Sequence, residues 1–388
     1  MMRGSLISWR RPAGLLAAGL LLAASAAAGE EAKQYEPRRA EGAGTPEEIG
    51  RSLGKELAAD IKNLHGLFLR VGELSNLKSR KKLYERARGM GEKLTADDRA
   101  EIKGLAEGAG IAFEDALFLN LFYDLTYGPA ACRGLAAWGA ATADGRLLHG
   151  RNLDWPDYPG KPLQRTNLIV NVRPKDGIEY CFLTWPGLQA VLTGTNRKGL
   201  TVSFNQLPDA PGGEALSEPV LFTLKRVLRT CADAEGAVKL IQAAKPLGSG
   251  SILISDSAGK TAVVVELSGG KLGVRRPAEG SAMIGNANHA TREAGLEGLA
   301  FGPAGSPTCD VAAELKKPLD VEAVKKVLAD RRVMQNINML AVVFAPAANR
   351  MHLSCGRMRA AEGAFKEYEL FAEEKPAESP PAAPAAER

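Results

Sequence analysis

The chain has 388 residues, 45% of them hydrophobic and 24% charged, so it is long enough to bury a large core in one or two domains. Its formal charge is +5, and Lys and Arg are not interleaved with aromatic residues, which argues against nucleic acid as a partner. The four histidines lie far apart, without carboxylates or thiols at ligand spacing, so we expect neither a metal site nor a cofactor.

Residues 1–28 have the pattern of a signal peptide. Three arginines flank the start of a short apolar run from Leu15 to Leu22, and Ala26-Ala27-Ala28 provides a small-residue cleavage site. The run is too short to span a membrane, and no cysteine directly follows the cleavage site to carry a lipid. We therefore expect an exported protein, periplasmic or secreted, without a stable membrane anchor.

Residues 29–131 are predicted to form a helical segment that begins with a loose polar lead-in over 29–44. Thr45-Pro46-Glu47-Glu48 is a capping box with proline at the first helical position, and Thr95 begins a second helix in the same way. The stretch from Phe113 to Leu125 is rich in Leu and Phe and is expected to be a buried helix. Apolar residues recur every four positions after the capping box, as in an amphipathic helix: Ile49, Leu53, Leu57 and Ile61.

From residue 132 the pattern changes to short β-type runs bounded by turn residues. Blocks of strands and blocks of helices, without regular alternation, indicate an α+β layered fold over residues 132–372. The tail 373–388 is rich in Pro, Ala and Glu and is predicted to be disordered. The expected strands are 135–138, 147–152, 167–172, 180–184, 200–205, 251–255, 261–267, 339–344 and 351–355, and the expected helices are 219–231, 233–244 and 320–329.

The cysteines single out Cys132 as a nucleophile. Because five is an odd number, at least one cysteine of an exported protein cannot be in an intramolecular disulfide. The residues 128–131 just before Cys132 are small or rigid. A thiol needs a base, and a cut just before Cys132 creates an α-amine, with a pKa of about 7.7–8.0, in the same residue. We therefore predict self-cleavage between Ala131 and Cys132. The other cysteines are interpreted as buried apolar residues of the core. One disulfide among them is possible, and the sequence does not assign it.

Arg151 and Asp154 lie one hairpin after Cys132. A five-residue loop over 141–145 sets Cys132 opposite Asp154, whereas a two-residue turn sets it opposite Asp157. In either register a carboxylate can hold the new ammonium, and Arg151 can stabilise a thiolate or bind the acyl oxygen of a substrate. The alternative is that Arg151 and Asp154 form a plain structural ion pair.

Asparagines provide two further candidates. Along 200–205 the odd-numbered residues share a polar face that ends in Asn205, whose side-chain amide suits an oxyanion donor. A turn-forming asparagine is the alternative at this position. The segment 285–289 contains Asn286 and Asn288 and by itself reads as a loop.

Together these motifs resemble the choloylglycine hydrolase and penicillin acyltransferase group of N-terminal-nucleophile hydrolases, and most of all its penicillin acyltransferase-like branch. Acid ceramidase and N-acylethanolamine amidase are relatives of this branch. The most specific match is Trp138-Gly139, then Asp144-Gly145 and the run from His149 to Trp155. The remaining matches are the segments 104–110, 120–122, 196–205 and 256–266 and Asn288-His289.

The resemblance implies a four-layer αββα sandwich and cleavage between Ala131 and Cys132, with the amine of Cys132 as its base. Cys132 is followed by Arg133-Gly134, where relatives often have Thr-Ser. The positions that the resemblance assigns are Arg151 and Asp154 around the nucleophile, Asn205 in the oxyanion hole, Asn288 (with Asn286 as the rival alignment) in substrate or oxyanion binding, and Trp155 and Asn286 as substrate contacts.

Our leading interpretation is an exported, self-processing amidase or N-acyltransferase that acts on a small non-peptide acyl amide through a thioester, with its two chains remaining associated. A second interpretation is a papain-like Cys-His hydrolase, which needs His149 or His289 within reach of the thiol. A third keeps the fold without the cleavage and makes the protein an exported binding protein.

Overall fold

The computed structural model describes residues 33–76, 79–125, 131–207, 218–246, 248–268, 270–289, 291 and 306–373. The chain divides into the units Met1–Lys33 and Gln34–Arg388, and every element below lies in the second. The predicted signal peptide, residues 128–130 and the tail from residue 374 lie outside the described residues. Within the described ranges, no helix combines the length and apolarity needed to cross a bilayer.

Three helices of the N-terminal segment begin where the sequence predicts, at Pro46, Ala96 and Phe113, whereas the predicted amphipathic helix through Ile61 is interrupted at Leu57. The Thr45 side chain accepts a hydrogen bond from Glu48 N, and the Glu48 carboxylate accepts one from Thr45 N at 2.8 Å, which confirms the capping box. Thr95 caps its helix through Asp98 N, and the buried helix 113–125 is also confirmed. The helices are α2 (Pro46–Glu56), α3 (Ala58–Asn76), α4 (Arg80–Gly91), α5 (Ala96–Ala109) and α6 (Phe113–Leu125).

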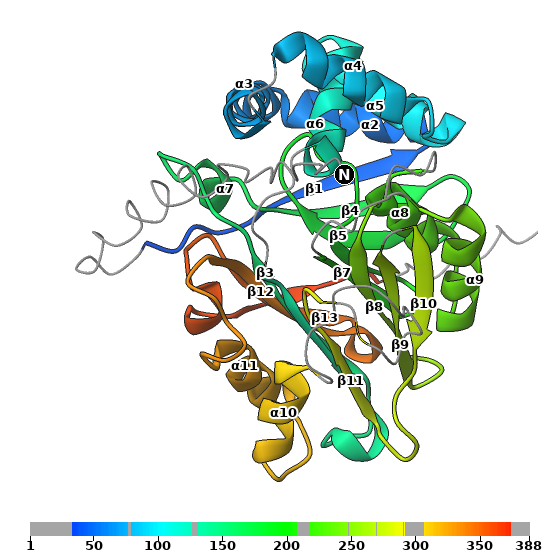
Figure 1. Ribbon diagram of the computed structural model, residues 1–388, viewed down its shortest axis with the longest axis vertical. Coiled ribbons are helices and arrows are strands. Elements are labelled where there is room, and N and C mark those ends of the chain that lie inside the picture. The colour runs from blue at the N-terminus through cyan, green and yellow to red at the C-terminus, as the bar shows by residue number, and fades with distance from the viewer. Residues whose placement is uncertain are drawn as a thin grey trace, which may run out of the picture. The chain divides into compact units, whose positions relative to one another are not determined.

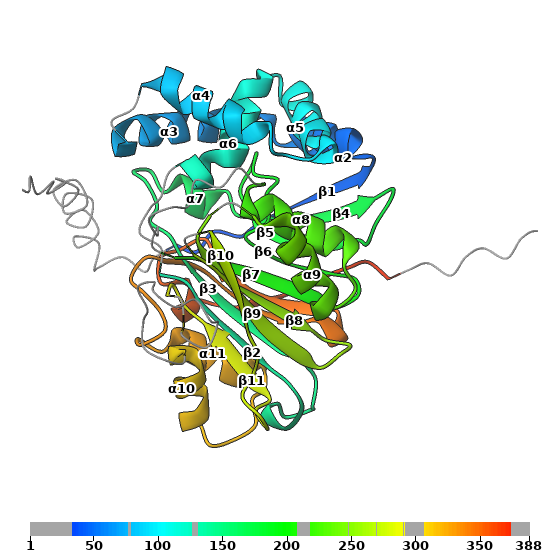
Figure 2. The same cartoon turned by 45° about the vertical axis from the view of Figure 1, so that its right-hand side comes forward.

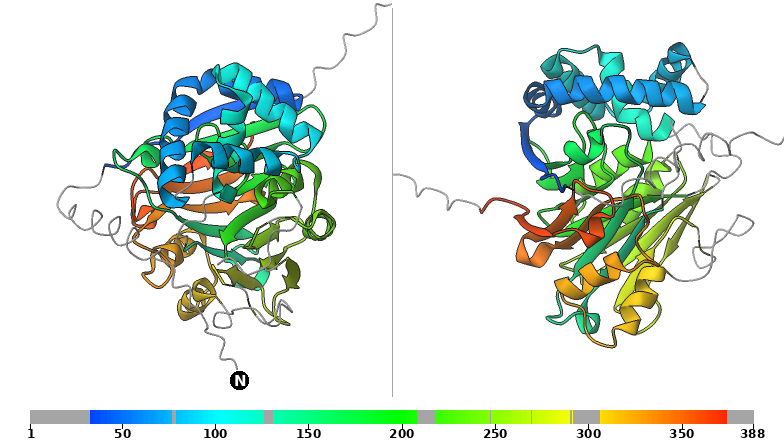
Figure 3. Two further views of the ribbon diagram at one scale, coloured as in Figure 1. Left: turned by 45° about the horizontal axis from the view of Figure 1, so that its top comes forward. Right: turned by 90° about the vertical axis from the view of Figure 1, so that its left-hand side faces the viewer.

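Helices α2 and α5 pack with their backbones almost in contact. A Cβ added at Gly50 of α2 would lie 1.9 Å from the carbonyl oxygen of Glu101, and one at Gly104 of α5 would lie 2.1 Å from that of Glu47. Only glycine allows this approach. In Figure 3 the helices α2–α6, in blue to cyan, gather at one end of the sheets.

The first sheet has eight strands in the order β1-β4-β5-β6-β7-β8-β9-β10 (Figure 1). Neighbouring strands are antiparallel except for the parallel pair β1 and β4. The strands are β1 (Arg38–Gly44), β4 (Leu168–Pro174), β5 (Tyr180–Thr184), β6 (Thr193–Asn196), β7 (Leu200–Gln206), β8 (Gly250–Asp256), β9 (Thr261–Ser268) and β10 (Lys271–Arg275).

The second sheet has six antiparallel strands in the order β11-β2-β3-β12-β13-β14. They are β2 (Arg133–Ala137), β3 (Leu148–Asp154), β11 (Met283–Asn286), β12 (Asn338–Ala345), β13 (Arg350–Cys355) and β14 (Lys366–Glu369). Short helical turns lie in the connections: η1 (Gly139–Ala141), α7 (Pro162–Arg165), η3 (Pro346–Ala348) and η4 (Ala360–Glu362).

Helices cover the outer face of each sheet, so the layers run helix, sheet, sheet, helix (Figure 2). α8 (Val220–Thr230) and α9 (Ala234–Ala244) lie on the first sheet, while α10 (Pro307–Glu314) and α11 (Val321–Ala329) lie on the second. The predicted α+β class and its αββα layering are confirmed. The two sheets pack on each other through a shared apolar cluster: Ala136, Trp138, Leu147, Leu253, Ala262, Val264 and Ile284.

The expectation of a loose lead-in over 29–44 is wrong for its second half. Residues 38–44 form β1, an edge strand that pairs along its whole length with β4. Only Ala40 and Gly42 of this strand are buried, so the sequence offers almost no apolar signal. A Cβ at Gly42 would lie 2.8 Å from Cγ2 of Ile49, because the strand lies directly under α2. The N-terminal segment therefore supplies a strand to the large sheet.

Both predicted registers of the hairpin after Cys132 are also wrong. Arg133 pairs with Asn152 in the ladder between β2 and β3. Extended by one residue, this register places Leu153, and not Asp154, opposite Cys132. The connection between β2 and β3 is longer than either predicted turn because it includes η1. There, Gly139 adopts a positive φ of 54° that starts the 3-10 turn.

Candidate active site

Cys132 and Arg151 meet between the two sheets. Cys132 lies directly before β2 with 2% of its surface exposed, and Nη2 of the fully buried Arg151 lies 3.7 Å from its Sγ. The same guanidinium donates to the carbonyl oxygens of Phe204 at 2.7 Å and Leu192 at 3.4 Å. Arg151 therefore extends from β3 across to the first sheet and fixes a cation beside the thiol.

Its arginine partner distinguishes Cys132 from the other cysteines. All five cysteines lie in the described residues and each is a free thiol, so the disulfide left open from the sequence does not form. Burial raises the pKa of Cys132, Arg151 opposes the rise, and the charge of Asp154 adds to it. Burial also raises the pKa of Cys181 and of Cys355 to about 12, and neither thiol receives a hydrogen bond from an arginine in the described structure. Both are suited to packing and not to chemistry.

Asp154 ends β3 beside the thiol, and its backbone N–H donates to Sγ of Cys132. Oδ1 of Asp154 accepts a hydrogen bond from Nδ2 of Asn338 at 2.8 Å. Oδ2 is buried and has no hydrogen-bond partner among the described residues. Burial raises the pKa of Asp154 to about 7, against the Asn338 hydrogen bond and the charges of two nearby arginines. One oriented carboxylate oxygen is thus available for a new donor.

Asn205 lies on β7 between two residues whose carbonyl groups are tied to the site. The carbonyl oxygen of Phe204 accepts from Arg151, and that of Gln206 accepts from Nδ2 of Asn288 at 2.6 Å. The side-chain oxygen and nitrogen of Asn205 are both buried without a partner in the described part of the chain. An unpaired buried amide costs about 1–3 kcal/mol, which favours a role toward a ligand over a role in packing.

Asn286 and Asn288 hold the end of β11 against the first sheet. Nδ2 of Asn286 donates to the backbone oxygen of Ser251 at 3.0 Å and to its hydroxyl at 3.2 Å. Ser251 pairs with Asn205 in the ladder between β7 and β8, so Asn286 contacts the residue that lies directly beside Asn205. Asn288 is half-buried, and its Oδ1 accepts from Nη1 of Arg133 at 3.2 Å. Both amides are therefore bound to protein groups in the uncleaved chain.

Trp155 contributes to an aromatic surface within the apolar core that also contains Cys132. Its ring centroid lies 5.8 Å from that of Tyr123, which in turn meets Phe204 edge-on at 5.6 Å. The three rings come from the end of β3, from α6 and from β7, so both sides of the predicted cleavage site contribute to this surface. All three side chains are largely buried.

His149 is held in the layer between the sheets and not against the thiol. Its Nδ1 lies 2.8 Å from the Ser255 hydroxyl and its Nε2 lies 3.0 Å from the Ser203 hydroxyl. Burial, together with the charge of Arg151, lowers the pKa of His149 to about 3. Because Ser255 and Ser203 occupy both ring nitrogens, His149 does not form the Cys-His pair of the second interpretation, and that pair stays a prediction for His289 alone.

Sequence patterns did not identify Arg133 and Asn338 as site residues. Nη1 of Arg133 lies 3.1 Å from the carbonyl oxygen of Ala131 and 2.9 Å from that of Cys132. Its only signal was the departure from Thr-Ser after the cysteine. Asn338, which orients Asp154, gave no signal because one asparagine at the start of a strand is an ordinary boundary residue.

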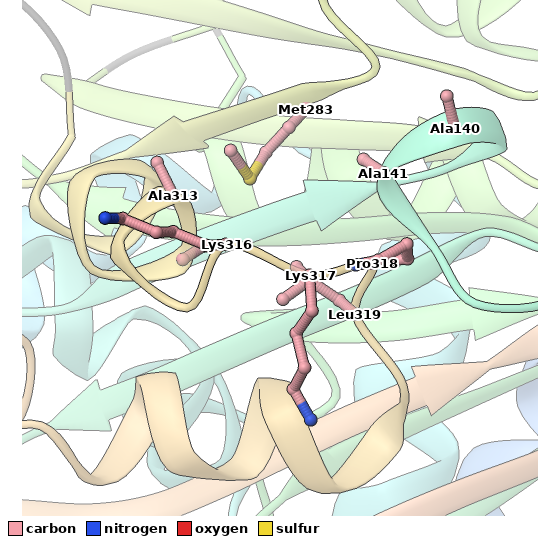
Figure 4. Close-up of a pocket in the computed structure, with 9 residues that line it drawn as sticks. Ala140, Ala141, Met283, Ala313, Lys316, Lys317, Pro318 and Leu319 are labelled. Carbon is pink, nitrogen blue, oxygen red and sulfur yellow. The ribbon is translucent and has the colours of Figure 1, made fainter.

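The structure brings the predicted site residues together at the ends of β2, β3, β7 and β11, while their catalytic roles remain predictions. A cavity of about 310 Å³ lies elsewhere, between η1, β11 and the connection from α10 to α11. Figure 4 shows residues that line it, among them alanines, Met283, Leu319 and the lysines Lys316 and Lys317. No predicted site residue lines this cavity.

Residues 141–300 match the family model described as acyl-coenzyme A:6-aminopenicillanic acid acyl-transferase. This match confirms the predicted family resemblance. The matched range begins after Ala131 and Cys132 and contains the other predicted site residues: Arg151, Asp154, Trp155, Asn205, Asn286 and Asn288.

Curated relatives match over parts of their length. The N-acylethanolamine-hydrolyzing acid amidase of Rattus norvegicus is 26% identical over 146 residues, which are 36% of this chain and 38% of that protein. Its namesake in Caenorhabditis elegans is 28% identical over 118 residues, 29% of this chain and 32% of the relative. The chain spans between about a fifth and two fifths of the length of the curated relatives that it matches. It is thus related to acyl-amide hydrolases and acyltransferases.

Solved structures give weaker similarities. The Caenorhabditis elegans ortholog of N-acylethanolamine-hydrolyzing acid amidase has a TM-score of 0.44 at 19% identity, over 55% of this chain and 93% of that chain. A mutant conjugated bile acid hydrolase from Clostridium perfringens has a TM-score of 0.45 at 14% identity, over 63% of this chain and 97% of that chain.

Proposed function

We propose that this protein is exported, cuts itself between Ala131 and Cys132, and then acts as an N-terminal-cysteine amidohydrolase or N-acyltransferase on a small non-peptide acyl amide. The observation that carries the proposal is the buried thiol of Cys132 with the guanidinium of Arg151 at 3.7 Å. The family match over 141–300 supports the same class of chemistry. Export rests on the signal-peptide pattern of residues 1–28.

Cleavage supplies the base for turnover of the substrate. The new α-amine of Cys132, with an ordinary pKa of about 7.7–8.0, takes the thiol proton, and the thiolate attacks the carbonyl carbon of the substrate amide. The ammonium then returns this proton to the leaving amine, and a thioester remains on Cys132. Water releases the acyl group as an acid, whereas an acceptor amine takes it over as a new amide.

The surrounding groups have complementary tasks. The unpartnered Oδ2 of Asp154 accepts a hydrogen bond from the ammonium, and Arg151 stabilises the thiolate. Nδ2 of Asn205 donates to the oxyanion of the tetrahedral intermediate, which gives that buried amide a partner. The aromatic surface of Trp155 and Tyr123 packs against the acyl group. The segment before Ala131 stays bound after cleavage, because β1 belongs to the large sheet.

The first test is the mass and N-terminal sequence of the purified mature protein. We expect two chains, of which the larger begins at Cys132, and turnover of N-acyl amide substrates by this form. Cys132→Ala should leave one intact chain and no turnover, because both the nucleophile and the future base are lost.

Cys309→Ala is the matched control. It removes another thiol, from α10, whose pKa burial raises to about 12, and should process and turn over normally. An intact wild-type chain that binds acyl amides without turnover would favour the binding-protein interpretation and contradict our proposal.

A further inference from the structure

Arg133 contacts the bond that the proposed self-cleavage breaks. Its Nη1 lies 3.1 Å from the carbonyl oxygen of Ala131, which is the acyl oxygen of the Ala131–Cys132 peptide bond. The same nitrogen lies 2.9 Å from the carbonyl oxygen of Cys132 and 3.2 Å from Oδ1 of Asn288. A cation therefore already lies at the oxygen on which negative charge develops when the thiol attacks Ala131.

Its surroundings hold the Arg133 guanidinium in this position. Asn288 Oδ1 accepts from Arg133, while Nδ2 of the same amide donates to the backbone of Gln206 on the first sheet, which fixes the amide. The arginine is half-buried, and its Nε is buried without a partner in the described part of the chain. A partly desolvated, oriented guanidinium stabilises an oxyanion more than one in water does, because less water competes with it.

Building on the proposed function, we infer that Arg133 is a catalytic residue of the self-cleavage, in which it stabilises the oxyanion formed on Ala131. Arg151 does not have this task, because its guanidinium is bound to Sγ and to two carbonyl oxygens of the first sheet. The Thr-Ser that relatives often carry after the cysteine is replaced here by a residue that reaches back to the scissile carbonyl.

The step balances with water as the co-reactant. Sγ of Cys132 bonds to the carbonyl carbon of Ala131, and the thiol proton passes to Oδ2 of Asp154. The oxyanion, held by Arg133, collapses and breaks the C–N bond, and the proton moves from Asp154 to the Cys132 nitrogen, which becomes the α-amine. Water then hydrolyses the thioester and leaves a carboxylate on Ala131 and a free thiol on Cys132.

The rate of self-cleavage tests this role directly. Wild-type and variant chains, synthesised in a cell-free system with a labelled amino acid, are followed by denaturing electrophoresis as the full-length band converts to two. Arg133→Met should slow the conversion by about 10²–10³, the usual cost of a lost oxyanion donor. Arg133→Lys should recover part of the rate, because it keeps the charge but loses the planar fork.

Arg276→Met is the matched control, since Arg276 forms an exposed ion pair with Glu235 and lies outside the site. It should convert at the wild-type rate, and thermal melting of Arg133→Met should show a cooperative transition. If Arg133→Met does not fold, Arg133→Gln is measured against the same criterion. A folded Arg133 variant without charge that converts within threefold of wild type overturns the inference while the proposed function stands. A wild-type chain that never converts overturns both.

Discussion

At the scale of single residues, Asp154 is the group whose charge controls the proposed base. Its carboxylate lies in a buried position with one oxygen on Asn338 and one unpartnered in the described structure. Once Cys132 carries an α-amine, an ionised Asp154 favours the charged form of that amine and so raises its pKa. Only the neutral amine can take the thiol proton, so the carboxylate sets the pH at which activity appears.

Asp154→Asn should therefore shift the acid limb of kcat/KM to lower pH, by about one to three pH units, because an opposite charge close to the ammonium is removed. Because Asp154 also carries the proton in the proposed self-cleavage, the variant is incubated until two chains form, and the limb is measured on this purified two-chain fraction with an N-acyl amide substrate. Asp144→Asn, in an exposed turn of the same hairpin, is the control and should leave the limb in place. A limb that Asp154→Asn does not move would contradict the role of the amine as base.

The uncleaved Cys132→Ala chain provides a second measurement of the same charge. The pKa of Asp154 is about 7 in the folded chain and about 3.9 when unfolded, so the folded state holds more protons between these values. The stabilisation that protonated Asp154 gives to the folded chain is therefore complete below pH 4 and is lost as the pH rises to 7. Adding Asp154→Asn should make the melting temperature fall less over this range, and an identical fall in both chains would contradict the raised pKa.

At the scale of elements, one histidine joins the strands that carry Arg151 and Asn205. His149 lies two residues before Arg151 on β3, and Ser203 lies two residues before Asn205 on β7, so each pair shares a face of its strand. The hydrogen bond between His149 and Ser203 therefore fixes the offset between Arg151, the proposed thiolate-stabilising cation, and Asn205, the proposed oxyanion donor. We interpret His149 as a positioning residue.

His149→Leu should lower kcat by about ten- to a hundredfold with little change in KM, because small misplacements of catalytic groups cost rate more than binding. Two serine hydroxyls are left unpaired, so the melting temperature should fall as well. Ser203→Ala should reproduce part of the loss in kcat. Ser255→Ala, on β8, should lower stability alone. Loss of the acid limb of the pH profile in His149→Leu would instead identify His149 as the base.

The elements of this fold differ in whether local sequence patterns predict them. Capping residues predicted the starts of α2 and α5, and a run rich in Leu and Phe predicted α6, because these signals are local. β1 was missed because its stability comes from pairing with a strand far along the chain, and its buried residues are only alanine and glycine. The hairpin register failed because η1 lengthens a turn that composition alone made look short.

The site followed the same division. The proximity of Cys132, Arg151 and Asp154 could be predicted because they lie within one hairpin, while their roles stay predictions that depend on residue type. The partners that orient them could not, because Asn338 reaches Asp154 from β12 and Arg133 turns back to the carbonyl of Ala131. Such contacts depend on tertiary distance and on side-chain conformation.

At the scale of the whole molecule, the segment before the proposed cleavage site is bound to the rest of the chain by a buried ion cluster. Nζ of Lys225, on α8, lies 2.6 Å from Oε2 of Glu101 and 3.5 Å from Oδ1 of Asp98, both on α5. All three side chains are buried. Buried charges of opposite sign depend on each other, since removing one partner leaves the others desolvated and uncompensated.

We therefore predict that the two chains co-elute in gel filtration after cleavage and that Lys225→Met loosens them. Loss of the lysine leaves two buried carboxylates without a counter-charge. The free energy of unfolding should fall by about 3–5 kcal/mol, seen as a large fall in melting temperature. Arg229→Met, which removes the partner of the mostly exposed Asp97 in the same interface, should cost no more than about 1 kcal/mol. Equal losses for the two variants would show that the buried cluster is not what holds α5 to α8. Separate elution of the wild-type chains would contradict their association.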